Sequence, residues 1–242
     1  MIAHALLASV VLAAPLGLTA APARLALAPG AHATVSVLNL GEATAVVEVA
    51  RTAFGLDLRG RPRIGGLAAP WFTVRPRRLV LRAGSRAVLA VAAVRRRGAA
   101  AGDHTSVLLL TTSIAGPPAV KVRMRIGVVV VVRVPGRVRR SLALERPLVV
   151  WRARMRVLRV TVENRGNVDE WIGRGRLVLR LLRGRQVVAV LRTGSRRLLA
   201  HTRGVVEVRV PSRLRGRVRA LVTIAPTTRG APDARRTTVL RL

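Results

Sequence analysis

Polar and apolar residues alternate along most of the chain after residue 24. Residues 32–39, 156–163 and 205–210 are three such runs, and Gly, Pro, Asn or Ser separate one run from the next. A period of two predicts β-strands that show one face to a core and the other to solvent. No stretch keeps its apolar residues at helical spacing, so the sequence predicts an all-β protein with very little helix.

The chain also repeats itself at an offset of 125 residues. The motif V-x-V-x-N-x-G occupies residues 35–41 and again residues 160–166. In each copy the glycine is expected to supply the positive φ of a tight turn. Two weaker matches, 79–84 with 198–204 and 102–104 with 216–218, follow in the same order in both halves. Two copies of one β-domain are therefore predicted.

The two copies meet near Val134-Pro135-Gly136, where proline ends a strand and glycine lets the chain turn. The expected domains are residues 24–135 and 137–242, each near the usual size of a single domain. The predicted fold is two tandem immunoglobulin-like β-sandwich domains, joined by a short linker that favours a fixed angle between them.

The amino-terminal residues lack the alternation seen in the rest of the chain. Residues 5–23 carry no charged side chain, and residues 5–14 form an apolar stretch typical of a signal peptide. Ala21-Pro22-Ala23 then offers a cleavage pattern of small residues. We interpret residues 1–23 as a signal peptide; an uncleaved N-terminal anchor and a buried first element of the fold are the alternatives. An exported protein, extracellular or associated with the cell envelope, is expected.

Charge changes the picture of possible partners. The chain has 44 Lys and Arg residues against 10 Asp and Glu, a net charge of +34, and Lys121 is the only lysine. Such a surface attracts anionic polymers and lipid headgroups, whether or not the arginines began as a compositional bias. The absence of cysteine excludes disulfides and thiolate metal sites.

Several segments appear in the order found in a known family. They are residues 24–30, 39–41, 69–76, 79–84, 102–104 and 122–128. This order resembles the peptidoglycan-binding domain of the WxL-interacting protein family and, more broadly, the domains of periplasmic pilus chaperones. Residues 160–168 and 210–216 resemble the domain that commonly follows. The resemblance implies an immunoglobulin-like fold and a role outside the cell, in contact with peptidoglycan and surface proteins.

The leading functional hypothesis is a secreted or cell-surface binding protein without catalytic activity. Its partners would be peptidoglycan, an anionic wall polymer or a surface protein, and its basic surface also allows peripheral contact with a membrane. One alternative is a periplasmic-type assembly chaperone that acts by β-strand addition. A second alternative, a basic nucleic-acid-binding protein, rests on charge alone, because aromatic residues for base stacking are scarce.

The candidate partner-binding residues follow from these hypotheses. The strand predicted at residues 121–132, which begins at Lys121, is the expected edge for strand addition. In pilus chaperones a basic pair in the cleft between domains anchors the partner's terminal carboxylate. Arg24 is similarly placed, and Arg123 or Arg125 would supply the second charge; the alternative is that these are solvated arginines on ordinary strands.

The three tryptophans are assigned by their surroundings. Trp171 follows a turn and two acidic residues, so it is expected to be exposed and could stack against a sugar, whereas Trp71 and Trp151 are expected to pack into the cores. The four histidines show no metal-ligand spacing, and neither a nucleophile elbow nor a phosphate-binding loop is present. No catalytic, cofactor-binding or metal-binding residue is therefore predicted, and the protein is not expected to be an enzyme.

Overall fold

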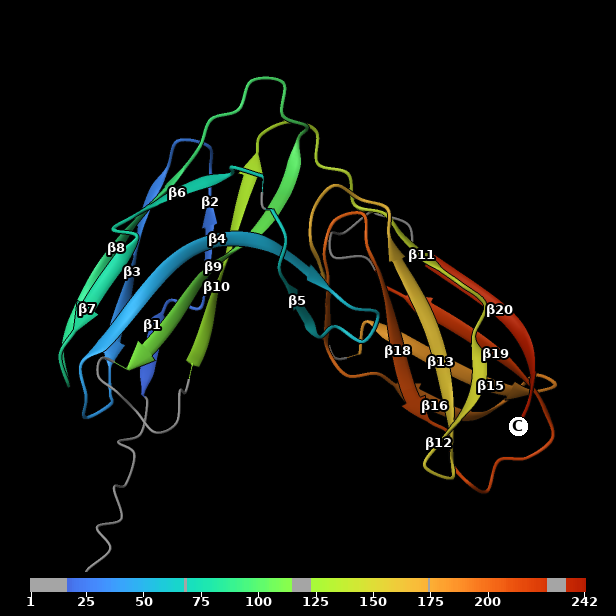
Figure 1. Cartoon of the computed structure of the whole chain (residues 1–242). Helices are drawn as coiled ribbons and strands as arrows, with labels where there is room; N and C mark the ends of the chain where they lie inside the picture. The colour runs from blue at the N-terminus through green and yellow to red at the C-terminus, as the bar shows by residue number, and fades with distance from the viewer. Residues whose placement is uncertain (1–16, 68, 115–122, 174, 226–233) are drawn as a thin grey trace, which may run out of the picture.

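The computed structural model describes residues 17–67, 69–114, 123–173, 175–225 and 234–242, and all regular structure in these ranges is β-strand. The strands form two sandwiches that lie next to each other (Figure 1). The all-β prediction of two tandem immunoglobulin-like sandwiches is confirmed. The strands of the first sandwich are β1 (Leu18–Ala21), β2 (Arg24–Leu27), β3 (His32–Asn39), β4 (Ala45–Leu56), β5 (Pro62–Ile64), β6 (Phe72–Arg75), β7 (Arg78–Leu81), β8 (Arg86–Ala93), β9 (Gly102–Ile114) and β10 (Arg123–Val134).

The first sandwich packs two sheets against each other. One sheet has the order β1-β3-β8-β6, and the other has the order β2-β10-β9-β4-β5 with β7 also paired to β4. The alternating residues of these strands point into one core of Val and Leu side chains together with Phe72. At the valine-rich end of β10, residues 128 and 130–132 are buried and Val129 is partly buried.

The second sandwich begins after a short connection. Its strands are β11 (Leu142–Leu144), β12 (Leu148–Arg152), β13 (Met155–Asn164), β14 (Glu170–Ile172), β15 (Leu177–Arg183), β16 (Gln186–Arg192), β17 (Arg196–Leu198), β18 (Arg203–Arg209), β19 (Arg217–Ile224) and β20 (Ala234–Arg241). Strand β13 pairs with β11, β12 and β18, while β16-β15-β19-β20 forms the facing sheet and β14 pairs with β17. These strands enclose a separate aliphatic core.

The repeated motif performs the same structural task in both sandwiches. In the first, the buried Asn39 side chain donates from Nδ2 to the carbonyls of Ala43, Leu81 and Arg82, at 2.8, 3.0 and 3.1 Å. Its Oδ1 accepts the amide of Gly41 at 3.0 Å. One side chain therefore satisfies backbone groups in two segments, the turn after β3 and the end of β7, and ties them together.

Asn164 repeats this arrangement in the second sandwich. Its Nδ2 donates to the carbonyls of Val168 and Leu199 at 2.9 and 3.0 Å and, more weakly, to that of Leu198 at 3.5 Å. Its Oδ1 accepts the amide of Gly166 at 3.0 Å. The first two sequence matches are thus the two ends of one hydrogen-bonded cluster, present once in each sandwich.

The positive φ expected for the glycine of each motif copy was wrong, because neither Gly41 nor Gly166 has one. At Gly166 the structure shows a different reason for glycine. Its φ lies outside the left-handed region, so the turn does not need a glycine for its backbone angles. A Cβ at this position would instead lie 2.4 Å from the carbonyl oxygen of Arg139. Glycine is required here because another backbone segment approaches closely.

Strand β1 lies inside the segment that the sequence analysis assigned to a signal peptide. Leu18 to Ala21 pair with β3 in an antiparallel register, from Leu18 opposite Asn39 to Ala21 opposite Ser36. Residues 1–16, which include the apolar stretch, lie outside the described residues. Among those that are described, there is no helix of the length and hydrophobicity that a membrane span requires.

The Asn164→Ala variant should lower the free energy of unfolding by about 3 kcal/mol, because several backbone groups would remain buried without partners. Urea denaturation measures this change. Asn164→Asp, which keeps the shape but replaces the donor with a carboxylate facing carbonyl oxygens, should be at least as destabilising near neutral pH.

Asn39→Ala provides the matched control, since it should loosen the first sandwich and leave the second intact. Hydrogen exchange resolved along the chain identifies which sandwich opens. A loss of less than about 1 kcal/mol for Asn164→Ala would contradict the assigned role.

Candidate functional site

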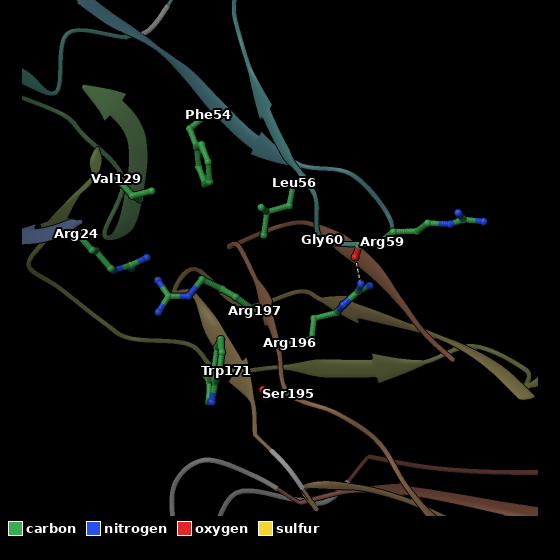
Figure 2. Close-up of a pocket in the computed structure, with 10 residues that line it drawn as sticks. All are labelled: Arg24, Phe54, Leu56, Arg59, Gly60, Val129, Trp171, Ser195, Arg196 and Arg197. Atoms are coloured by element: carbon green, nitrogen blue, oxygen red, sulfur yellow. Dashed lines mark hydrogen bonds between the residues drawn. The ribbon is translucent and has the colours of Figure 1, made fainter. Parts of the chain in front are cut away.

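A cavity of about 430 Å³ lies between the two sandwiches. Four arginines, three apolar side chains, one tryptophan, one serine and one glycine line it, and no acidic residue does. The lining residues, shown in Figure 2, are Arg24, Phe54, Leu56, Arg59, Gly60, Val129, Trp171, Ser195, Arg196 and Arg197. We refer to this cavity as the basic cleft.

Strands of the first sandwich supply one wall of the cleft. Strand β2 is parallel to β10, with Arg24 opposite Val129, so the register places both residues at the same point of the sheet. Phe54 and Leu56 come from the far end of the long strand β4. This wall is therefore apolar, with the Arg24 guanidinium at its edge.

The paired strands β14 and β17 of the second sandwich supply the opposite wall. Their register sets Trp171 opposite Arg197, and the Arg197 guanidinium carbon lies 5.7 Å from the centre of the indole ring. Trp171 is 52% exposed, as expected from the sequence. Its open ring and the nearby cation form a surface that can take an apolar group beside an anion.

Arg24 and Arg197 turn their guanidinium groups toward each other across the cleft (Figure 2). Arg24 is anchored at 3.2 Å to Oδ2 of Asp169, whose side chain is 7% exposed. Burial raises the pKa of Asp169 above its usual 3.8, although the bond from Arg24 opposes this. Two arginines facing one space, with no acid lining it, create a positive potential that suits a carboxylate or another small anion.

The angle of the cleft depends on Asp103 at the junction of the sandwiches. Its fully buried side chain accepts Nε and Nη2 of Arg133 at 2.6 and 2.8 Å, and the backbone amide of Asp169 at 2.9 Å. Its own backbone amide donates to the carbonyl of Asn167. Burial raises the pKa of Asp103, but these donors outweigh burial and hold the pKa below 3.8. Asp103 of the first sandwich thereby holds the turn that leads into β14 by hydrogen bonds to its backbone.

A second connection spans the cleft from the other side. The turn between β4 and β5 reaches the second sandwich (Figure 1), and the carbonyl of Leu58 accepts the amide of Val205 at 2.6 Å. Arg196 donates to the same carbonyl at 2.6 Å and also to the carbonyl of Arg59 (Figure 2). Strands β4 and β5 pair from Phe54 with Ile64 to Leu56 with Pro62, so this region is a hairpin that bridges the two sandwiches.

Strand β10 presents an open edge that leads into the cleft. It pairs with β9 along its whole described length but with β2 only from Val129 to Val132. In the parts of the chain that the structure describes, residues 123–128 have no strand on their outer side. Met124 and Ile126 of this stretch pack partly against the first core. The open edge ends at Val129, where the cleft begins.

The structure brings together some of the predicted partner-binding residues. Arg24 and Trp171 line the same cleft from opposite sandwiches. Arg123 and Arg125 are exposed on the open edge of β10, and Arg125 lies four residues before Val129, roughly 13 Å along the strand. They are therefore not the second charge beside Arg24. Lys121 lies outside the described residues.

Sequence reasoning missed the residues that complete the cleft. Arg197 and Arg196 were noted only as part of the general charge, and Arg59 was not singled out. No local pattern distinguishes them from the other arginines, because their role arises from the hairpin and from the pairing of β14 with β17. Asp169 beside Trp171 was the one local signal, as a rare acid in a basic chain.

Two other predictions about side chains can be compared with the structure. Trp71 is partly buried against the first core, stacked on His104 with ring centres 3.7 Å apart and covered by Arg96. Trp151 was expected to pack, which was wrong, because 67% of its surface is exposed. Within the described ranges no three His, Cys, Asp or Glu side chains come close enough to hold a metal ion.

Comparisons with known proteins show which solved structures share this fold. No family model and no curated protein matches the sequence. Among solved structures, a chain of a chaperone–tip adhesin complex for CFA/I fimbriae biogenesis has a TM-score of 0.56 at 10% identity, covering 91% of this chain and 98% of that chain. The class 5 fimbriae chaperone CfaA has a TM-score of 0.52 at 10% identity, covering 92% and 98%.

These likenesses support the fold and not a shared sequence family. The immunoglobulin-like architecture of pilus chaperones, expected on broader resemblance, is confirmed for the chain. The narrower resemblance to the WxL-interacting protein family stays a prediction.

The Asp103→Asn variant should lower the free energy of unfolding by about 2 kcal/mol near pH 6, because the bonds from Arg133 lose their charge assistance. The folded-state pKa of Asp103 lies below 3.8, so this stabilisation is present above 3.8 and is lost as the pH falls through the folded-state value. Urea denaturation should therefore show a smaller gap between the two proteins at pH 3 than at pH 6.

Glu48→Gln provides the control, since it removes an exposed ion pair with Arg78 and should change stability little at either pH. An equal gap between wild type and Asp103→Asn at both pH values would mean that the charge of Asp103 is not what stabilises the junction.

The Arg196→Gln variant should loosen the bridging hairpin, because the carbonyls of Leu58 and Arg59 lose a charged donor. The Val205 amide, which bonds to Leu58, should exchange with deuterium about tenfold faster. Arg197→Gln changes the neighbouring residue and removes the same charge but has no bond to the hairpin, so it should leave this exchange unchanged. Equal effects from both variants would rule out the specific contact.

Proposed function

We propose that this protein is an assembly chaperone of the cell envelope that binds an extended segment of an exported protein by β-strand addition. The observation that carries the proposal is the open edge of β10, which runs directly into the basic cleft. No strand of the described chain pairs with the outer side of residues 123–128, and Val129, the next residue, lines the cleft beside Arg24. One extended ligand can therefore use both features at once.

The direction of the bound segment follows from this geometry. A terminal carboxylate held between Arg24 and Arg197 lies at the Val129 end of the open edge. The segment that precedes it then runs parallel to β10, from the Arg123 end toward the cleft. Its alternate side chains would contact Met124 and Ile126, which sit at the margin of the first core.

The comparisons favour this function over wall-polymer binding, which the sequence analysis put first. Two solved structures with TM-scores above 0.5 are described as a fimbrial chaperone and as a chaperone complex with a tip adhesin. A strand-addition mechanism needs no catalytic group, in agreement with the prediction that the protein is not an enzyme. The nucleic-acid alternative gains no support, because the arginines that converge face a cleft with a single tryptophan.

Export remains part of the proposal, with a revised boundary. Cleavage after Ala23 would remove β1, which pairs with β3 through four residues. We place the start of the first sandwich at or before Leu18 and any export cleavage upstream of it, so that residues 18–135 and 137–242 are the two domains. N-terminal sequencing of the exported protein would identify this boundary.

The partner should co-purify as one particular exported protein when the native chain is isolated from an envelope extract. Arg24→Gln and Arg197→Gln should each weaken this capture at least about tenfold, because each removes a charged donor for the carboxylate. Arg77→Gln, which removes an exposed arginine outside the cleft, should capture the partner normally.

Hydrogen exchange of the purified complex tests the strand addition itself. The amides of residues 123–128 should gain protection on binding, since the added strand covers this edge. Sedimentation of the chain with purified cell walls at low salt, together with unchanged exchange at the β10 edge in any co-purified complex, would instead favour wall binding and contradict the proposal.

A further inference from the structure

The tip of the β12–β13 hairpin lies at the far end of the second sandwich (Figure 1). A second cavity, of about 370 Å³, lies at this tip. Ala153 and Arg154 form its two-residue turn, with φ angles of 42° and 64°. Trp151 and Met155 flank the turn and are 67% and 40% exposed. The register pairs Trp151 with Arg156 and Met155 with Arg152, so these two large apolar side chains project from opposite faces of one protruding hairpin.

The position of Trp151 explains its exposure. The register sets Trp151 opposite Arg156, and the preceding pair on the same face is Val149 with Leu158. Leu158 is fully buried in the second core. Trp151 thus points along the core face of the sheet, but one step beyond the last side chains of the core.

Arginines surround this tip. Arg154, Arg156, Arg209 and Arg215 line the cavity, and no acidic residue lies among its lining residues. Arg156 donates to the carbonyl of Ser212 at 2.8 Å, which fixes its direction, while the other three are exposed. The nearby Glu207 is bound by Arg159 and Arg152 on the face of the sheet that also carries Met155, opposite to the face of Trp151, and these two arginines balance its charge.

We propose that this tip, comprising Trp151, Met155 and the four arginines, docks the protein on an anionic lipid surface. An exposed tryptophan and a flexible apolar neighbour suit the boundary between headgroups and acyl chains, where tryptophan is enriched in proteins. The arginines pair with lipid phosphates at the same depth. A single tryptophan at a hairpin tip suits this boundary better than nucleic acid, whose bases stack on successive aromatic side chains. The site lies on the second sandwich away from the basic cleft and does not depend on the proposed chaperone function.

Sedimentation with vesicles tests the proposal on the full exported chain. Binding is expected to vesicles of phosphatidylglycerol and phosphatidylethanolamine and to be much weaker with phosphatidylcholine alone. Trp151→Ala should weaken the partition about tenfold, through the apolar area no longer buried. Arg154→Gln should weaken it about fivefold.

Arg97→Gln is the matched control, because it removes one exposed arginine from the first sandwich and should leave vesicle binding unchanged. Brominated lipid should quench the fluorescence of the wild type, and most of this quenching should disappear in Trp151→Phe. Thermal unfolding verifies that each variant is folded, and Trp151→Ala should still capture the protein partner.

Three outcomes would overturn the inference. One is unchanged vesicle binding after Trp151→Ala combined with Met155→Ser, and another is an equal loss for Arg97→Gln and Arg154→Gln. The third is binding to short duplex DNA through the same residues without binding to anionic vesicles, which would assign the tip to nucleic acid.

Discussion

The buried carboxylate of Asp103 is the contact on which the functional geometry depends. Two sandwiches with separate cores share a site only if their relative orientation is fixed, and Asp103 binds Arg133 from its own sandwich and the Asp169 amide from the other. Asp169 in turn holds Arg24. Because these bonds form a chain from the junction to the cleft, the position of Arg24 follows from the angle between the sandwiches.

The two-sandwich architecture could largely be predicted from the sequence, because the signals for it lie in short stretches of the chain. Alternation of polar and apolar residues reports burial directly, and the two asparagines mark corresponding strand ends. Asn39 and Asn164 each join a strand end to a segment some 35 to 43 residues later. A buried polar side chain with several partners leaves little freedom for substitution, so it stands out when two distant copies are compared.

The cleft could be predicted only in part, because its residues come from elements whose proximity no local pattern encodes. Arg24 was found by resemblance and Trp171 by its neighbouring turn. Arg197 joined them through strand pairing, and Arg196 through a hairpin bridge between the sandwiches. In a chain with so many arginines, residue type alone carries little information, and the environment of each guanidinium decides its role. The same limit applies to Trp151, whose exposure depends on where the core ends.

The bridging hairpin also has a consequence for the order of folding. Strand β18 lies at the edge of its sheet, and its Val205 amide is capped by the carbonyl of Leu58 from the first sandwich. An uncapped edge strand is a template for aggregation. Synthesis begins at the amino terminus, so the residues of this hairpin are available before β18 is made. The first sandwich thus occupies part of an edge at which the second could otherwise pair with another copy of itself.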